Sequence, residues 1–282
     1  MYGYFLNPLA ALVVLFPVIV GAAILSQGSW RVRFTLTRDL GIPWGITGSL
    51  IGMTQMLAQT SVNSDSVPVD AIYPATGVML ITIFYGGILS AVAHFLTETK
   101  WAASDHNSWA PIGFWRPTIV VANLGLILLY NIFSKEQFEF FFDGAAALIC
   151  GLSVVLVLLV SGPGRRPTNL SRAFLFSSMV AVIAGLIMLF MGDKDRGLFV
   201  AANGLLYGLV GYVILYIWYA GRPEGETINA PLTNWHWMEV TGFFIFMFLA
   251  PDTILDNFQE EALQQQIQEL QSEIAILRGD GS

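Results

Sequence analysis

The chain has little charge and almost no cysteine, and these two shortages narrow its class. Charged residues make up 12% of the 282 residues, about half of the roughly 25% usual in soluble domains. Hydrophobic residues make up 55% and gather in runs near the roughly 20 residues that a membrane-spanning helix needs. Cys150 is the single cysteine, which excludes an intrachain disulfide. We therefore expect an all-α, polytopic membrane protein surrounded by lipid.

The sequence also lacks the motifs of enzymes and cofactor sites. It has no Gly-rich phosphate loop, no His-Glu-x-x-His, no nucleophile elbow and no Cys/His cluster with metal spacing. We therefore expect no enzymatic activity, no cofactor and no metal site. The net charge is −7, and the acidic excess lies in the last segment, so nothing favours nucleic-acid binding.

Hydropathy predicts eight membrane spans, at residues 6–26, 43–60, 72–97, 115–134, 142–162, 171–191, 197–220 and 236–255. The N-terminus has no basic residue before its first apolar run, so we expect that run to be retained rather than cleaved as a signal peptide. Nine of the 13 Lys and Arg residues fall at one side of the predicted spans. The positive-inside rule makes this side cytoplasmic, which predicts an inner (cytoplasmic) membrane protein with both termini outside.

The two halves of the chain resemble each other. Ala110-Pro111 and Trp115 recur as Ala230-Pro231 and Trp235, Ile46-Thr47-Gly48 resembles Ile183-Ala184-Gly185, and Ala75-Thr76-Gly77 resembles Ala202-Asn203-Gly204. This predicts two four-helix repeats, at residues 1–138 and 139–258. Because four spans is an even number, the two repeats have the same orientation in the membrane.

The second and third predicted spans carry unusual numbers of glycines and hydroxyls. Gly45, Gly48 and Gly52 share one helical face, where another helix can approach closely, and Gly204-x-x-x-Gly208 is a similar packing pattern in the second half. Hydroxyl side chains within a membrane each need a partner or water. The candidates are Thr47, Ser49, Thr76 and Thr82.

This stretch resembles the MotA/TolQ/ExbB proton-channel family. The resemblance covers residues 43–97 and rests on Gly45-Ile-Thr-Gly-Ser-Leu-Ile-Gly52 and on Met79-Leu-Ile-Thr-Ile-Phe-Tyr-Gly86, with Pro74 ahead of the second motif. It departs from the family pattern at Ser49 and Ile83, where that family has Thr. The resemblance implies that the hydroxyls line an ion path and that a separate single-span partner supplies the proton-carrying Asp. The short inner loops leave no room for that family's cytoplasmic domain.

The remaining features are few. His94 and Glu239 are the ionisable groups within predicted spans, each near an interface where it can snorkel. Residues 259–282 form a predicted amphipathic helix with a heptad seam, which favours a coiled-coil partner over a solvated helix. The seam is Leu263, Ile267, Leu270, Ile274 and Leu277.

Three functions follow from these patterns. The first is a MotA/TolQ/ExbB-like subunit that assembles with itself or with single-span partners in an ion-gradient-coupled complex. The second is a non-conducting scaffold whose outer coil recruits a partner. The third is a small-molecule secondary transporter, which lacks the support of a broken-helix pair or a midplane charge.

Overall fold

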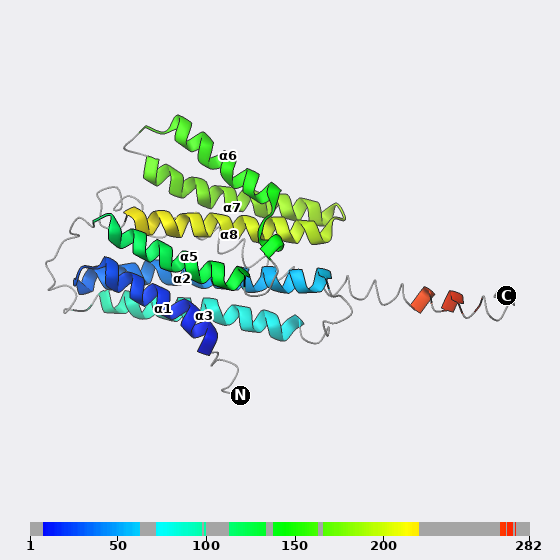
Figure 1. The fold of residues 1–282 in the computed structure, drawn as a ribbon, viewed down its shortest axis with the longest axis horizontal. Coiled ribbons are helices and arrows are strands. Elements are labelled where there is room, and N and C mark those ends of the chain that lie inside the picture. Colours follow the sequence, from blue (N-terminus) through cyan, green and yellow to red (C-terminus); the bar gives the residue numbers. More distant parts are fainter. Residues whose placement is uncertain are drawn as a thin grey trace.

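The structure is a computed structural model that describes residues 8–62, 72–97, 99, 113–133, 138–162, 166–219, 266–268, 270–272 and 274. This part of the chain is all-helical and contains no strand (Figure 1). The elements are α1 (Pro8–Leu25), α2 (Trp30–Val62), α3 (Ile72–Thr97), α5 (Trp115–Phe133), the short 3-10 helix η4 (Phe138–Phe141), α6 (Gly144–Val160), α7 (Arg166–Phe190) and α8 (Lys194–Tyr219).

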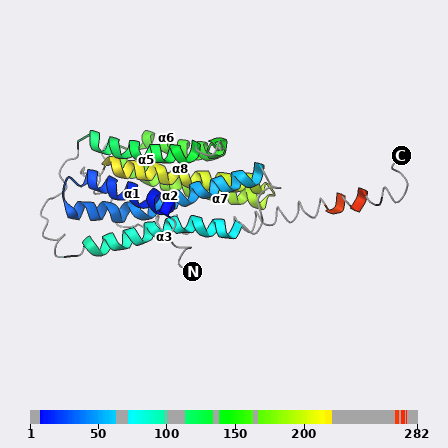
Figure 2. The same cartoon turned by 60° about the horizontal axis from the view of Figure 1, so that its bottom comes forward.

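Four long helices form a row in the spatial order α7, α8, α2, α3. The closest pairs are α7 with α8 and α2 with α3, and α2 packs on α8 to join them. Helix α1 lies against α2, α3 and α5, while α6 lies against α7 and α8. Figures 1 and 2 both place α3 and α6 on opposite sides of the bundle. The row therefore has two outer ends, at α7 and at α3.

Two buried apolar clusters hold the row together. One cluster joins α2 to α8 through side chains such as Leu50, Met53 and Leu205, with Val182 of α7 and Phe141 of η4 at its edge. The other joins α1, α2, α5, α7 and α8. Because α2 and α8 contribute to both clusters, these two helices form the centre of the bundle.

Within the described residues, four helical segments are long and apolar enough to cross a membrane, at Leu80–Thr97, Glu139–Val160, Asn169–Phe190 and Arg196–Tyr219. Shorter apolar helices occupy Leu12–Leu25 and Trp115–Tyr130. Membrane embedding accounts for the many large apolar side chains on the outside of the bundle, since lipid rather than water then covers them. The eighth predicted span, at 236–255, lies outside the described residues.

The second helix begins 13 residues earlier than the predicted span at 43. Gln27 and Gly28, with φ of 51° and 94°, make a left-handed turn directly after α1. The Ser29 hydroxyl then accepts a hydrogen bond from the Val32 N–H at 3.3 Å, which caps the new helix. Residues 30–42, expected to be an inner loop, are therefore helical, and the arginines in this stretch lie on α2.

Candidate functional site

The α2–α3 contact is built around three glycines on α2. A Cβ atom at Gly41 would lie 2.7 Å from the Gly86 carbonyl oxygen, and one at Gly45 would lie 2.8 Å from the Thr82 carbonyl oxygen. One at Gly48 would lie 3.4 Å from the Thr82 Cβ. The two helices therefore touch backbone to backbone, as small residues allow in membrane proteins. Gly52 lies one turn further along α2 and is half-buried.

Hydroxyl groups bridge the same contact. Ser49 Oγ and Thr82 Oγ1 are 2.8 Å apart, and Thr82 Oγ1 also donates to the Gly45 carbonyl at 3.0 Å. Ser49 is fully buried and Thr82 is 9% exposed. These two candidates therefore meet each other within the chain, and each has a hydrogen-bond partner.

The other two hydroxyl candidates are placed differently. Thr47 is fully buried and donates to the Pro43 carbonyl of its own helix at 2.9 Å. The side chain of Thr76 lies outside the part of the chain that the structure describes. The structure thus brings two of the four sequence candidates together at one contact.

Ser90 is a further bridging hydroxyl, which the sequence patterns did not identify. Its Oγ donates to the Arg38 carbonyl at 2.7 Å and accepts from the Ile42 N–H at 3.2 Å. A regular helix would join these two backbone groups directly. The bridge lies one residue before Pro43, which carries no N–H and disturbs the helix. Its position two helical turns after Thr82, on the same face of α3, could have identified Ser90 from the sequence.

A carboxylate near the other face of α2 was also missed. Asp39 Oδ2 accepts a hydrogen bond from the Tyr216 hydroxyl of α8 at 2.7 Å, and Asp39 Oδ1 lies 2.6 Å from Arg38 Nε. Tyr216 is 1% exposed and the Asp39 side chain 18%. Assignment of residues 27–42 to a loop hid this group, because a loop carboxylate would simply be solvated. The Asp39–Tyr216 hydrogen bond links the central helices α2 and α8.

A second glycine contact joins α7 to α8. A Cβ at Gly208 would lie 2.7 Å from the Phe174 carbonyl oxygen, and one at Gly197 would lie 2.7 Å from the Leu189 nitrogen. Gly204 packs directly on the Ala181 side chain. These helices are as closely packed as α2 and α3, and the Ser177 and Ser178 hydroxyls of α7 donate to the Phe174 and Leu175 carbonyls of their own helix.

Among the residues that the structure describes, two buried polar atoms have no hydrogen-bond partner. They are Thr54 Oγ1 on α2 and Asn203 Oδ1 on α8, and both residues are fully buried. Asn203 uses its Nδ2 to donate to the Phe140 carbonyl at 2.9 Å, which holds η4 on α8. Helices α2 and α8 are antiparallel, so counting 15 residues from the Asp39–Tyr216 bond places residue 201 of α8 opposite Thr54. Because a helix rises about 1.5 Å per residue, Asn203 lies within about 3 Å of the height of Thr54 along the helix axes.

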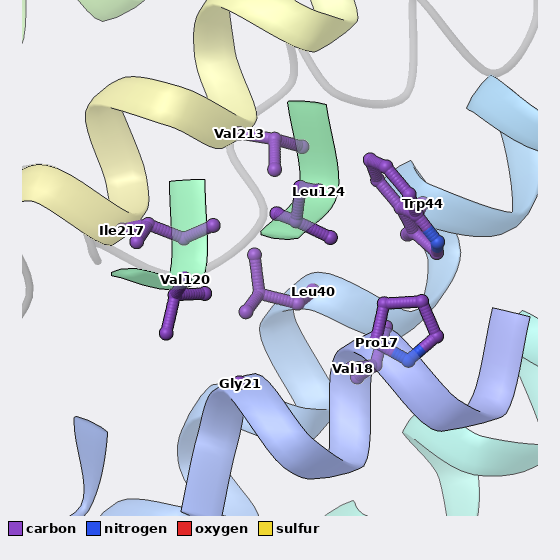
Figure 3. Close-up of a pocket in the computed structure, with 9 residues that line it drawn as sticks. All are labelled: Pro17, Val18, Gly21, Leu40, Trp44, Val120, Leu124, Val213 and Ile217. Carbon is purple, nitrogen blue, oxygen red and sulfur yellow. The ribbon is translucent and has the colours of Figure 1, made fainter. Parts of the chain in front are cut away.

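A small apolar cavity lies between α1, α2, α5 and α8 (Figure 3). Its volume is about 10 Å³, and its lining includes Pro17, Gly21, Trp44 and Leu124. A water needs about this much room and two or more polar partners. The side chains drawn in Figure 3 are hydrocarbon except for the Trp44 indole, whose N–H already donates to the Val13 carbonyl at 3.0 Å. This cavity is a packing defect rather than a ligand site.

Other predicted features have less structural context. Within the described residues no three His, Cys, Asp or Glu side chains form a group that could hold a metal ion. His94 is exposed near the end of α3, and Glu239 lies outside the described residues. Of the heptad seam, Ile267, Leu270 and Ile274 are described and are exposed, while Leu263 and Leu277 are not described.

The fold and the contacts define an all-helical protein with several helices long and apolar enough to cross a membrane and with a tightly packed, hydroxyl-bridged contact between α2 and α3. No protein-family model matches the chain, and comparisons with curated proteins and with solved structures found no match.

Proposed function

We propose that the chain is a membrane assembly subunit, a scaffold that holds a rigid row of helices and joins other subunits through the outer faces of that row. The Ser49–Thr82 hydroxyl pair carries this proposal. An ion path needs hydroxyls that face a water-filled lumen, whereas these two are buried and face each other. Membrane proteins use such bonds to fix one helix on another.

We infer that the two halves are an internal repeat, because glycine contacts recur in both halves. Gly48 packs on α3 and Gly185 packs on α8, and these glycines are 137 positions apart. Gly41 packs on Gly86 and Ser178 packs on Gly208, and positions 41 and 178 are also 137 apart. The third helices of the two repeats, α3 and α8, then align Tyr85-Gly86 with Tyr207-Gly208. This differs by five positions from the alignment of Ala75-Thr76-Gly77 with Ala202-Asn203-Gly204. We place the repeats at residues 1–138 and 139–258.

A second function has one specific observation in its favour. The unpartnered Thr54 hydroxyl and Asn203 amide oxygen lie at similar heights on α2 and α8, and Thr54 belongs to the stretch that resembles the MotA/TolQ/ExbB family. A buried polar atom without a protein partner accepts water or an ion more readily than a bonded one. An ion-coupled subunit, with the carboxylate supplied by a single-span partner, would use these atoms rather than Ser49 and Thr82.

Proton flux separates the two functions. The purified chain, alone and with any co-purifying single-span subunit, is reconstituted into vesicles that contain a pH-sensitive dye, and a pH gradient is imposed. The scaffold proposal predicts no flux above that of empty vesicles. Flux that Thr54→Val and Asn203→Leu abolish, while Thr118→Val on the outside of α5 leaves it unchanged, would replace the scaffold with the ion-coupled subunit.

Native mass spectrometry of gently extracted complexes tests assembly directly. The scaffold proposal predicts defined oligomers or complexes with other membrane subunits. A chain that is monomeric and alone in its native membrane extract would overturn it.

A further inference from the structure

One end of the bundle is rich in arginine. Helices α2, α5 and α7 begin at this end and α8 finishes there (Figure 1). Among the side chains that the structure describes, this end has Asp39 and five arginines, which are Arg31, Arg33, Arg38, Arg116 and Arg172. Towards the opposite end lie Arg196 and three carboxylates, those of Glu139, Asp143 and Asp193. The two ends of the described bundle therefore carry charges of opposite sign.

Arginines stand at this end where helices usually begin with acidic residues. The first turns of α2, α5 and α7 contain no acidic residue, while Arg31 and Arg116 lie in the first turns of α2 and α5. The N-terminal end of a helix carries a partial positive charge that an anion stabilises. Helix α6, which begins towards the other end, has such an anion, because the Asp143 carboxylate accepts from the Ala146 N–H at 2.7 Å. The arginine-rich end is thus positive through both its side chains and its helix ends.

Two of the five arginines have partners inside the protein. Arg33 Nε donates to Ser26 Oγ at 3.4 Å, and the Arg33 guanidinium lies 4.4 Å from the centre of the Trp30 ring. Arg38 pairs with Asp39 at 2.6 Å. Arg33 therefore holds the turn between α1 and α2, and Arg38 neutralises the carboxylate that bonds α8.

The other three, Arg31, Arg116 and Arg172, are exposed. Within the described residues, none of these three guanidinium groups has an ion pair or a hydrogen bond. Arg31 and Arg116 each follow an exposed tryptophan, since Trp30 is 41% and Trp115 is 73% exposed. Tryptophan is enriched at the level of the lipid headgroups. The two arginines therefore lie at the height where a membrane presents its phosphates.

Arg172 lies slightly deeper on the outside of α7. The Phe174 ring packs on Gly211 of the antiparallel helix α8, which places Arg172 at about the height of residue 213, five residues before Trp218. This is about 8 Å below Trp218, at about 1.5 Å per residue. A long basic side chain at this depth extends towards the headgroups while its stem stays among the acyl chains.

We infer that this end of the bundle binds the headgroups of anionic phospholipids through Arg31, Arg116 and Arg172. A guanidinium group offers paired donors that match the oxygens of a phosphate. The apolar surface that acyl chains need continues from the arginines along the helices: Ile119 and Leu126, on the same face of α5 as Arg116, are 53% and 66% exposed. The lipid is the occupant because it supplies both the anion and the apolar chains. This inference goes beyond the proposed function, since neither a scaffold nor an ion-coupled subunit requires a particular headgroup.

Native mass spectrometry with two lipids of matched acyl chains tests the surface. The purified full chain in detergent is titrated with phosphatidylglycerol and, separately, with phosphatidylcholine, and the bound lipids are counted. We expect phosphatidylglycerol to bind at least about fivefold more tightly, the effect of one basic residue at an anionic surface. Replacing all three arginines together, by Arg31→Gln, Arg116→Gln and Arg172→Gln, should make the two lipids bind equally. Arg116→Gln alone should remove part of the preference.

Two control variants separate this surface from net charge and from folding. Arg196→Gln removes an exposed arginine from the other end and should keep the full preference. Lysine at the three positions keeps the charge and should keep most of the preference.

Four outcomes would overturn the inference. The unaltered chain could bind both lipids equally, or the preference could survive in both the triple and the single glutamine variants. Arg196→Gln could reduce the preference as much as Arg116→Gln, which would assign it to net charge. Inorganic phosphate at the concentration of the lipid could displace phosphatidylglycerol, which would assign the arginines to a free anion.

Discussion

At the scale of single residues, hydroxyl and carboxylate groups hold α2 to its neighbours α3 and α8. Ser49 and Thr82 satisfy each other between α2 and α3, and Ser90 bridges two backbone groups next to Pro43. The phenol of Tyr216 reaches Asp39 across the α2–α8 contact. Each bond removes a polar group from an environment that offers little water, so its loss should be measurable.

Thr82→Val tests the hydroxyl bridge. The change keeps the side-chain shape but removes the bonds to Ser49 and to the Gly45 carbonyl. We expect a loss of about 1–2 kcal/mol in unfolding free energy, as for other interhelical hydrogen bonds in membranes. Unfolding in detergent measures it. Thr118→Val on α5, whose hydroxyl bonds only its own helix, should cost less, and an equal loss in both variants would contradict the bridge.

Tyr216→Phe tests the bond between the two halves. Asp39 keeps Arg38 but loses the phenol that donates to its Oδ2. Hydrogen bonds to charged groups contribute about 1.5–3 kcal/mol, so we expect a destabilisation in this range. Tyr130→Phe on the exposed face of α5 is the control. If Tyr216→Phe also loses its effect in an Asp39→Asn background, the energy belongs to this pair.

At the scale of helices, glycine decides which pairs come close. Gly86 lies directly against Gly41 and Gly45 of α2, while a Cβ at the adjacent Gly87 would meet no atom within 4 Å. These neighbours differ only in the face they occupy, which makes them a matched pair.

Gly86→Ala should push α3 away from α2, because its methyl group would meet the Gly41 carbonyl. Overpacking of this kind costs about 1–3 kcal/mol, and it should lower the thermal unfolding temperature in detergent. Gly87→Ala should leave that temperature unchanged or raise it slightly, since alanine favours a helix. Equal effects at both positions would show that helix propensity, and not the α2–α3 contact, controls stability.

The sequence predicted the glycine faces of α2 and α8 more readily than the start of α2. Small residues at regular helical spacing indicate a close contact without any knowledge of the partner, so Gly45, Gly48, Gly204 and Gly208 could be selected by pattern. The start of α2 could not, because its arginines reduce hydropathy over the first three turns while Ser29 and Gly28 set the boundary locally. Asp39 was not selected as a candidate because it lies in the part of α2 that was expected to be a loop.

At the scale of the whole molecule, sequence periodicity indicates helices but not which of them are neighbours. The buried Thr54 and Asn203 atoms lie at similar heights only because α2 and α8 pack on each other. That adjacency joins the two halves through apolar faces that resemble lipid-facing ones in sequence.

The orientation of the bundle gives a whole-molecule prediction. Gly113 lies just before α5, at the end where α3 and α8 finish, and Asp193 lies in the turn between α7 and α8 at the opposite end. Positively charged residues concentrate in sequence around the first end, so the positive-inside rule places it in the cytoplasm. In a Cys150→Ala chain, a membrane-impermeant maleimide added to intact cells should label Asp193→Cys and not Gly113→Cys. Both should react after the cells are permeabilised, since both positions are exposed. The predicted labelling leaves the α7–α8 turn and the segment before α6 on the outer side, where the outer domain of a single-span partner would contact them. Reversed labelling would invert the topology and place that domain at the arginine-rich end.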